Sequence, residues 1–155
     1  MNKANYHLYF GKAGHLFVMS EFLLRGWNVA IPEVDEGDDI FVVQHEQGRL
    51  ARIQVKTSRV KYQKEGFLAT FSISTNQLED VSKDDIFYVF LIRNEDSWEK
   101  LIIISREELF DTLADTILAS NSKNQTVRLL FKKGKIFLRN TDFTKYQNNF
   151  TDFEI

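Results

Sequence analysis

The sequence predicts a layered α/β (α+β) domain in which helices flank a mixed β-sheet. The predicted elements follow the order helix, several strands, helix, strands, helix. Residues 85–92 form a nearly continuous apolar run, which is typical of a strand buried on both faces. The chain of 155 residues is 43% hydrophobic and 14% aromatic, which suffices for one core. No repeat or Pro/Gly-rich linker divides it, so we expect a single domain over 1–155.

The first predicted helix spans about 12–25 and ends at Gly26, a residue type that commonly follows a helix C-terminus. Its expected buried stripe has helical spacing and comprises Ala13, Leu16, Phe17, Ser20, Leu23 and Leu24. A short strand is expected over 27–31 and ends at Pro32. An acidic turn over 34–38 follows, and then a hairpin formed by strands 40–44 and 50–57.

The second half begins with a strand of alternating pattern over 67–73 and a short helix or turn over 75–81. The buried strand over 85–92 and one further strand over 101–104 follow. Ser105 and Glu108 form a capping box, which predicts a helix to about residue 119. A hairpin is expected over 127–138, with Lys132, Lys133 and Lys135 around its turn. We expect 142–153 to be a last helix whose aromatic residues serve the core or a subunit contact: Phe143, Tyr146, Phe150 and Phe153.

Composition excludes several classes of function. The absence of cysteine excludes disulfides, thiolate metal sites and a cysteine nucleophile. No signal-peptide core or run of membrane-spanning length is present, so we expect a cytoplasmic protein with no membrane partner. The net charge of −2 and pI near 5.9 count against nucleic acid as a partner, and only a local basic patch would restore it. No Ser-His-Asp order, P-loop or dinucleotide fingerprint occurs.

Three polar residues stand at or inside two apolar strand segments. Asp39 precedes the first segment, and Gln54 and Lys56 share one face of the second. Such a set suits divalent-metal phosphodiester chemistry: Asp39 would anchor the ion, and the Gln54 amide and the Val55 carbonyl would add oxygen ligands. Lys56 would orient or deprotonate water and stabilise the transition state. The alternative is a turn aspartate beside an ordinary solvent-facing strand edge.

At these residues the chain resembles the PD-(D/E)XK nuclease superfamily, and most closely its small bacterial and archaeal members with a Gln-X-Lys half-motif. The likeness covers roughly the first 60 residues and rests on these segments in order: His7-Leu8-Tyr9-Phe10-Gly11-Lys12-Ala13-Gly14, the following helix, Gly26-Trp27-Asn28-Val29, Asp39-Ile40 and Gln54-Val55-Lys56-Thr57-Ser58. The resemblance implies a restriction-endonuclease-like α-β-β-β-α-β core and Mg²⁺- or Mn²⁺-dependent cleavage of DNA. It also implies that Asp39 is the metal-anchoring acid, Gln54 the variant second acid and Lys56 the catalytic lysine.

One position departs from that family. Many relatives carry a glutamate on the first helix, where this chain has His15. Glu21 is the next acid along the helix, but six residues turn it by about 240° from His15. His15 and Glu21 are therefore accessory candidates, and Asp38 and Glu36 are close enough in sequence to assist.

A basic run follows the candidate site. Arg59, Lys61 and Lys64 lie after it, and Arg52 shares the strand face of Gln54 and Lys56. These side chains can neutralise DNA phosphates, and the alternative is a solvated hairpin.

We therefore predict a Mg²⁺- or Mn²⁺-dependent endonuclease of resolvase, repair or restriction type that binds DNA as a homodimer or higher homo-oligomer. The alternative is a catalytically degenerate nuclease fold that acts as a nucleic-acid-binding or protein-interaction module, which His15 and the acidic pI favour. A third possibility is a structural or immunity-type partner without a nucleic-acid role. Of the remaining histidines, His45 is expected in a solvated loop, and His7 either approaches the site or is an exposed N-terminal residue.

Overall fold

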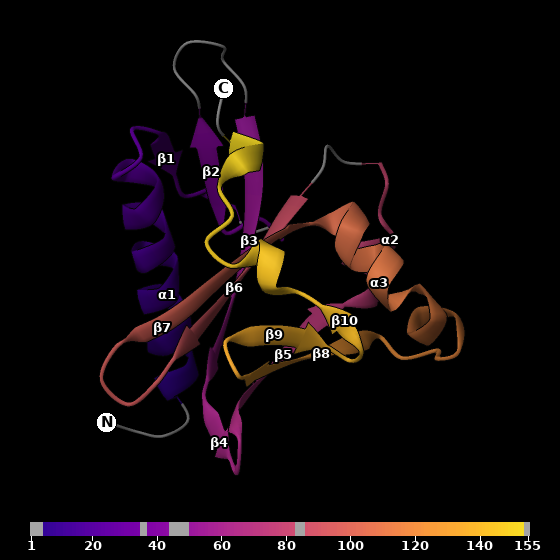
Figure 1. Ribbon diagram of the computed structural model, residues 1–155. Helices are drawn as coiled ribbons and strands as arrows, with labels where there is room; N and C mark the ends of the chain where they lie inside the picture. Colours follow the sequence, from indigo (N-terminus) through magenta and orange to yellow (C-terminus); the bar gives the residue numbers. More distant parts are fainter. Residues whose placement is uncertain (1–4, 35–36, 44–49, 83–85, 154–155) are drawn as a thin grey trace.

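The computed structural model describes residues 5–34, 37–43, 50–82 and 86–153. These residues form two five-stranded β-sheets, a long and a shorter α-helix, a one-turn helix and two 3₁₀ turns (Figure 1). The elements are α1 (Tyr6–Leu23), β1 (Asn28–Ala30), β2 (Ile40–Val43), β3 (Leu50–Arg59), β4 (Lys61–Gln63), β5 (Gly66–Ser74), α2 (Thr75–Glu79), β6 (Ile86–Arg93), β7 (Trp98–Ser105), α3 (Arg106–Leu118), β8 (Asn124–Lys132), β9 (Lys135–Leu138), β10 (Thr141–Asp142), η2 (Thr144–Tyr146) and η3 (Thr151–Phe153).

The first sheet has the strand order β1-β2-β3-β6-β7. It is mixed, because β3 and β6 run parallel while the other neighbours are antiparallel. Along the chain, α1, β1, β2, β3, α2 and β6 follow one another with only β4 and β5 inserted. The predicted α+β architecture and its α-β-β-β-α-β order are therefore confirmed.

The second sheet has the order β10-β9-β8-β5-β4 and was not predicted as a separate sheet. The strands expected at 67–73 and 127–131 do form, but β5 pairs with β8 and not with the first sheet. Their alternating pattern identified a buried and an exposed face, and such a pattern carries no information about the pairing partner. Figure 1 shows this sheet at the lower end of the molecule, beside the crossing strands β6 and β7.

Helix α1 starts at Tyr6, six residues before the predicted start near Lys12. Its expected buried stripe is largely wrong, because only Phe17 of that stripe packs against the core. The residues that it buries are Gly14, Val18 and Phe22, whereas Leu16, Leu23 and Leu24 are exposed. Apolar residues occur on more than one side of this helix, so spacing alone could not select the packed face.

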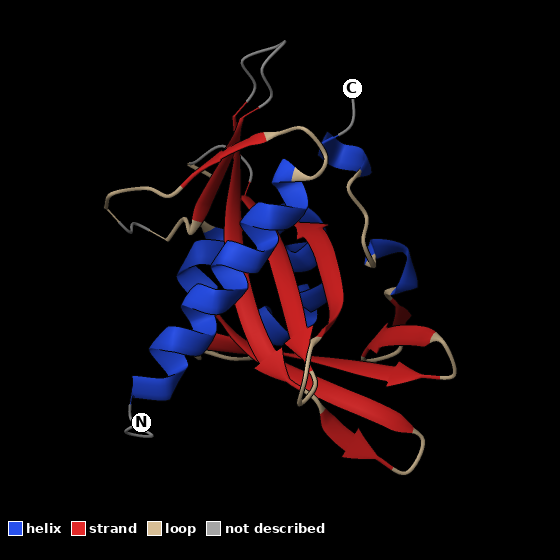
Figure 2. Cartoon of the chain, turned by 90° about the vertical axis from the view of Figure 1, so that its left-hand side faces the viewer, coloured by secondary structure: helices blue, strands red, loops and turns tan. Residues whose placement is uncertain are grey.

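Glycines decide two features of α1. A Cβ at Gly14 would collide with the side chain of Thr57, so glycine permits α1 to lie close against β3. Figure 2 shows this helix lying across one face of the first sheet. Gly26 has φ +83°, which confirms the predicted end of the helix.

Two hydrophobic clusters lie on opposite faces of the first sheet. One contains Val18 and Phe22 of α1, Ile53 and Val55 of β3, and Phe153. The other fills the space between the first sheet, the second sheet and α3. β6 contributes alternate residues to both clusters and is buried on both faces, as its continuous apolar run predicted.

The C-terminal segment is not the predicted helix. It forms two 3₁₀ turns, and between them Asn148 has φ +50° and its N–H donates to the carbonyl of Leu101 at 2.9 Å. This bond to β7 replaces an intrahelical one. The aromatic residues expected to pack are nevertheless buried: Phe143, Tyr146, Phe150 and Phe153.

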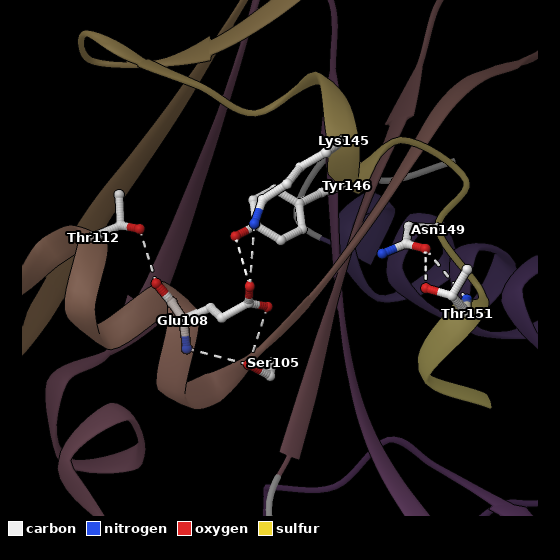
Figure 3. A network of polar contacts seen from close by, with 7 residues as sticks. All are labelled: Ser105, Glu108, Thr112, Lys145, Tyr146, Asn149 and Thr151. Carbon is white, nitrogen blue, oxygen red and sulfur yellow. Dashed lines mark hydrogen bonds and ion pairs between the residues drawn. The ribbon is translucent and has the colours of Figure 1, made fainter. Parts of the chain in front are cut away.

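Glu108 ties this segment to the start of α3 (Figure 3). The predicted cap forms, since Ser105 Oγ accepts a hydrogen bond from the Glu108 N–H at 3.2 Å. The Tyr146 hydroxyl donates to Glu108 Oε1 at 3.0 Å, and Lys145 Nζ lies 3.4 Å from the same oxygen. Burial raises the pKa of the Tyr146 hydroxyl, so it stays protonated and able to donate at neutral pH.

Candidate functional site

Asp39 directly precedes β2, at the end of the ladder where the pairing of β2 with β3 stops. Ladder pairing reaches Ile40 opposite Ile53, and the Asp39 N–H still donates to the Ile53 carbonyl at 2.9 Å. The N–H of Val55, two residues beyond Ile53, donates to Asp39 Oδ2 at 2.7 Å. The carboxylate thus replaces the strand neighbour that β3 loses at this point. We call the space beside Asp39, where β2 and β3 separate, the fork. Because the N–H and C=O of one strand residue point the same way, the Val55 carbonyl also faces this fork.

Gln54 contacts Asp39 through its amide nitrogen. Gln54 Nε2 donates to Asp39 Oδ2 at 2.5 Å, and Gln54 Oε1 accepts from Gln77 Nε2 at 2.6 Å. Gln77, on α2, also donates to the Gly37 carbonyl at 2.6 Å. Gln77 therefore fixes the Gln54 amide with its nitrogen towards Asp39 and its oxygen away from it, so the predicted ligand oxygen does not face the carboxylate.

Asp38, the residue before Asp39, is buried and forms an ion pair with Arg52 through Oδ2. Its other oxygen, Oδ1, is buried and has no hydrogen-bond partner among the described residues. A buried carboxylate oxygen without a donor is unfavourable unless a cation or water approaches it. Arg52, predicted as a DNA contact, is held in this intramolecular pair.

A cavity of ≈ 370 Å³ opens on the α1 side of Asp39. Its α1 wall includes His7, Gly11 and His15, which are spaced four residues apart and so lie in one row on the helix. His15 Nε2 is 3.5 Å from Asp39 Oδ1. The structure therefore brings His15 to Asp39, and it places His7 in the wall of the same cavity.

Lys56 follows Gln54 by two residues on β3, so its side chain leaves the strand on the same face. That face is opposite the one that carries Ile53 and Val55 into the cluster around α1. In the described part of the chain no ion pair or hydrogen bond engages the Lys56 ammonium group. Asp39 thus sits in the fork, with His15 approaching from the α1 side and Gln54 and Lys56 on the other face.

Glu21 is not brought to the fork. It forms an ion pair with Arg25, 2.9 Å away and four residues further along α1, and it does not line the cavity. The rotation of about 240° expected between His15 and Glu21 accounts for this. Glu36 and His45 lie outside the described residues.

The other predicted DNA contacts lie at or beyond the end of β3. Arg59 hydrogen-bonds the Tyr6 hydroxyl, and its guanidinium lies 5.2 Å and 5.5 Å from the ring centroids of Tyr6 and Phe10. Lys61 and Lys64 are exposed on the β4–β5 hairpin. These two are therefore free to meet a partner, whereas Arg59 holds the first turn of α1.

The donor set of the fork is small. No group of three or more His, Asp or Glu residues in metal-binding arrangement occurs within 5–34, 37–43, 50–82 and 86–153. The atoms available to a cation are Oδ1 of Asp39, the unpartnered Oδ1 of Asp38, the Val55 carbonyl and the His15 ring. Mg²⁺ retains several waters and is commonly held by one or two carboxylates, so this set fits a hydrated divalent ion.

Sequence reasoning missed Gln77 and Lys12. Gln77 lies 23 positions after Gln54 on a short helix, and no spacing rule links the two. Lys12 lines the cavity beside Asp39. It directly follows Gly11, a member of the row formed by His7, Gly11 and His15, and this position in the sequence could have identified it.

Comparison with known proteins shows a fold that this chain shares with a solved structure. No protein-family model matches the chain, and no curated protein matches it. The solved structure of a bacterial homing endonuclease, I-Ssp6803I, is similar, with a TM-score of 0.55 and 16% identity over 92% of this chain and 88% of that one. None of the described helices is long and apolar enough to cross a membrane. The structural similarity shows that the chain shares the α+β fold of that endonuclease.

Proposed function

We propose that the chain hydrolyses phosphodiester bonds of DNA with Mg²⁺ or Mn²⁺ bound at the fork between β2 and β3. The observation that carries the proposal is the placement of Asp39, whose carboxylate is held by the Val55 N–H and the Gln54 amide. Oδ1 of the same carboxylate faces His15 beside an open cavity. A fixed carboxylate with one oxygen turned outwards is what anchoring a hydrated ion requires.

Each side chain then has a distinct role. The bound ion supplies Lewis-acid activation of water and of the attacked phosphate. Asp39 and the Val55 carbonyl hold the ion, and Asp38 Oδ1 adds a second negative oxygen nearby. The Lys56 ammonium group stabilises the charge that develops on the phosphate and positions the attacking water.

Gln54 acts first as a positioning residue, because it donates to Asp39. It becomes a ligand only if its amide rotates, and that rotation requires Gln77 to release Gln54 Oε1. His15 stands where many members of the superfamily that the chain resembles carry a glutamate, and it contributes a nitrogen donor, which suits Mn²⁺ better than Mg²⁺.

The partner and the assembly complete the proposal. The fold shared with a protein described as a homing endonuclease supports DNA as the substrate. Small nucleases of this kind often cut the two strands of a duplex with two such forks, which supports a homodimer with twofold symmetry or a higher oligomer.

The test is cleavage of plasmid and branched DNA by the wild-type chain in Mg²⁺ or Mn²⁺. Asp39→Asn and Lys56→Met should each reduce the cleavage rate by at least about 100-fold, on the scale typical of lost transition-state stabilisation. Asp111→Asn, at an exposed position of α3, makes the same chemical change as Asp39→Asn and should leave the rate unchanged. Undiminished cleavage by both site variants would refute the assignment.

A degenerate, non-catalytic version of the fold is the second candidate. The small donor set and the direction of the Gln54 amide favour it. Calorimetry separates the two: DNA binding without measurable Mn²⁺ binding at neutral pH identifies the degenerate protein.

A further inference from the structure

We propose that the outer face of the second sheet binds the sugar-phosphate backbone of double-stranded DNA. The choice of DNA rests on the proposed function, whereas the surface itself is identified by charge and geometry. It lies outside the fork and extends beyond the basic residues that sequence reasoning selected.

Positive charge is concentrated in this sheet. Residues 61–74 and 124–142, which contain all its strands, hold seven Lys or Arg and two acidic residues, a formal charge of +5. Since the whole chain carries −2, the remainder carries −7. The molecule is thus strongly polarised, and the acidic pI conceals the local basic patch that a phosphate partner requires.

Both acids of the sheet are already neutralised. Glu65 pairs with Lys132 at 2.6 Å, and Asp142 pairs with Lys135 at 3.2 Å. The other five basic side chains are exposed and have no acidic partner within the described ranges: Lys61, Lys64, Arg128, Lys133 and Arg139. The net charge of the sheet is therefore carried by groups that remain available to a ligand.

The register places two of these groups, Lys61 and Arg128, on the face that points away from the core. Residues directly opposite in an antiparallel ladder face the same side, and Lys61 lies opposite Leu68 while Arg128 lies opposite Thr70. The intervening residues of β5, such as Ala69 and Phe71, are buried in the core. Lys61, Thr70 and Arg128 therefore lie together on the outer face.

This outer face is hollowed. A groove of ≈ 560 Å³ is lined by Arg128, Arg139, Thr126, Ser122 and Asn124, among others. Guanidinium, hydroxyl and amide groups are the side chains that most often contact phosphate oxygens of DNA. The groove thus offers several donors on a rigid sheet.

Two hairpin turns hold a basic residue in the left-handed region. Lys133 has φ +51° in the β8–β9 turn, and Arg139 has φ +56° in the β9–β10 turn. Glycine and asparagine are the residues that usually occupy such positions, because a longer side chain strains the backbone there. A lysine and an arginine at this conformational cost indicate that positive charge at the turns is useful.

The face fits a duplex better than a single strand or a membrane. Single strands are bound by exposed aromatic rings, whereas the ring of Phe137, which lines the groove, is half-buried. A membrane surface is met by protruding apolar side chains, whereas Leu68 and Leu130 are also half-buried. Strands of a sheet do lie in the grooves of duplex DNA.

The experiment measures binding of the full chain to a fluorescent 30-base-pair duplex in EDTA, over a series of salt concentrations. The test variant is Arg128→Gln with Arg139→Asn, in which asparagine suits the left-handed turn. The matched control is Arg25→Gln with Arg93→Gln, which removes two arginines from the first-sheet half of the molecule. Circular dichroism verifies that both variants fold.

We expect the test variant to bind at least about tenfold more weakly at 0.1 M salt and to lower the salt slope by about 2, as two lost phosphate contacts require. The control should keep the wild-type slope. Equal losses in the two variants, no wild-type binding at low salt, or equally tight binding of single strands or anionic vesicles would each overturn the proposal. Binding in EDTA is independent of cleavage, so duplex binding without cleavage in Mn²⁺ would instead contradict only the proposed function.

Discussion

The backbone N–H of Val55 donates to Oδ2 of Asp39 at 2.7 Å, across the point where β2 leaves β3. A strand that loses its neighbour exposes N–H groups that must find another acceptor. Here that acceptor is the carboxylate that the proposed function needs at this place. The same bond therefore satisfies the backbone of β3 and holds the candidate metal anchor.

Replacing Gln54 by glutamate separates the positioning and ligand roles of this side chain. Gln54→Glu removes the donor to Asp39 and places two carboxylates together, so the metal-free variant should lose about 1–3 kcal/mol of unfolding free energy at pH 7. Thermal unfolding with and without Mn²⁺ measures this, and Mn²⁺ should stabilise the variant more than the wild type. Equal stabilisation by Mn²⁺ would exclude position 54 from the metal site.

Gln77 is expected to act through Gln54. Gln77→Met removes its bonds to Gln54 Oε1 and to the Gly37 carbonyl, and should cost about 1–2 kcal/mol of unfolding free energy. Its cleavage rate should fall with little change in DNA affinity, because Asp39 is no longer positioned. Asn76→Ala, at the preceding exposed position of α2, is the control and should change neither quantity. An unaltered rate in folded Gln77→Met would show that the amide pair is purely structural.

Tyr146 should stabilise the attachment of the C-terminal segment to α3. Tyr146→Phe keeps the buried ring and removes the bond to Glu108 Oε1, so chemical denaturation should show a loss of about 1 kcal/mol. Lys145→Gln removes an exposed ion pair with the same oxygen and an exposed cation–π contact with the Tyr146 ring, and should have little effect. A larger loss for Lys145→Gln than for Tyr146→Phe would contradict this account of the network in Figure 3.

The β8–β9 turn should gain stability when its charge is removed. Lys133→Asn places a residue that tolerates φ +51° before Gly134, and should raise the unfolding free energy by about 0.5–1 kcal/mol. The same change should weaken duplex binding in EDTA, since one exposed cation is lost. Stability and DNA affinity that fall together would mean that the lysine is structural and does not serve a ligand.

The sequence predicted most elements of the fold and the proximity of Asp39 to Gln54. The buried strand β6, the cap of α3 and the end of α1 at Gly26 each follow from a local rule, and each was confirmed. The positions of Asp39 and Gln54 on neighbouring strands followed from the predicted hairpin, and their side chains are in contact.

The rest depends on tertiary packing. The separation into two sheets, the buried side of α1 and the partnership of Gln54 with Gln77 join residues through space, and no periodicity encodes such choices. The prediction of a C-terminal helix was wrong because the Asn148 N–H donates to the carbonyl of Leu101 in β7, which lies 47 residues earlier in the chain. The net charge of the whole chain counted against a nucleic-acid partner, because it averages the charge of a basic sheet with that of an acidic remainder.

The most direct test of the central claim is a crystal structure of the chain soaked in Mn²⁺, with the ion located by its anomalous scattering. We expect the ion in the fork, coordinated by Asp39 Oδ1, with the Val55 carbonyl or Asp38 as a further ligand. A fork that stays without Mn²⁺ at millimolar concentration, or an ion bound only by carboxylates elsewhere, would contradict the account.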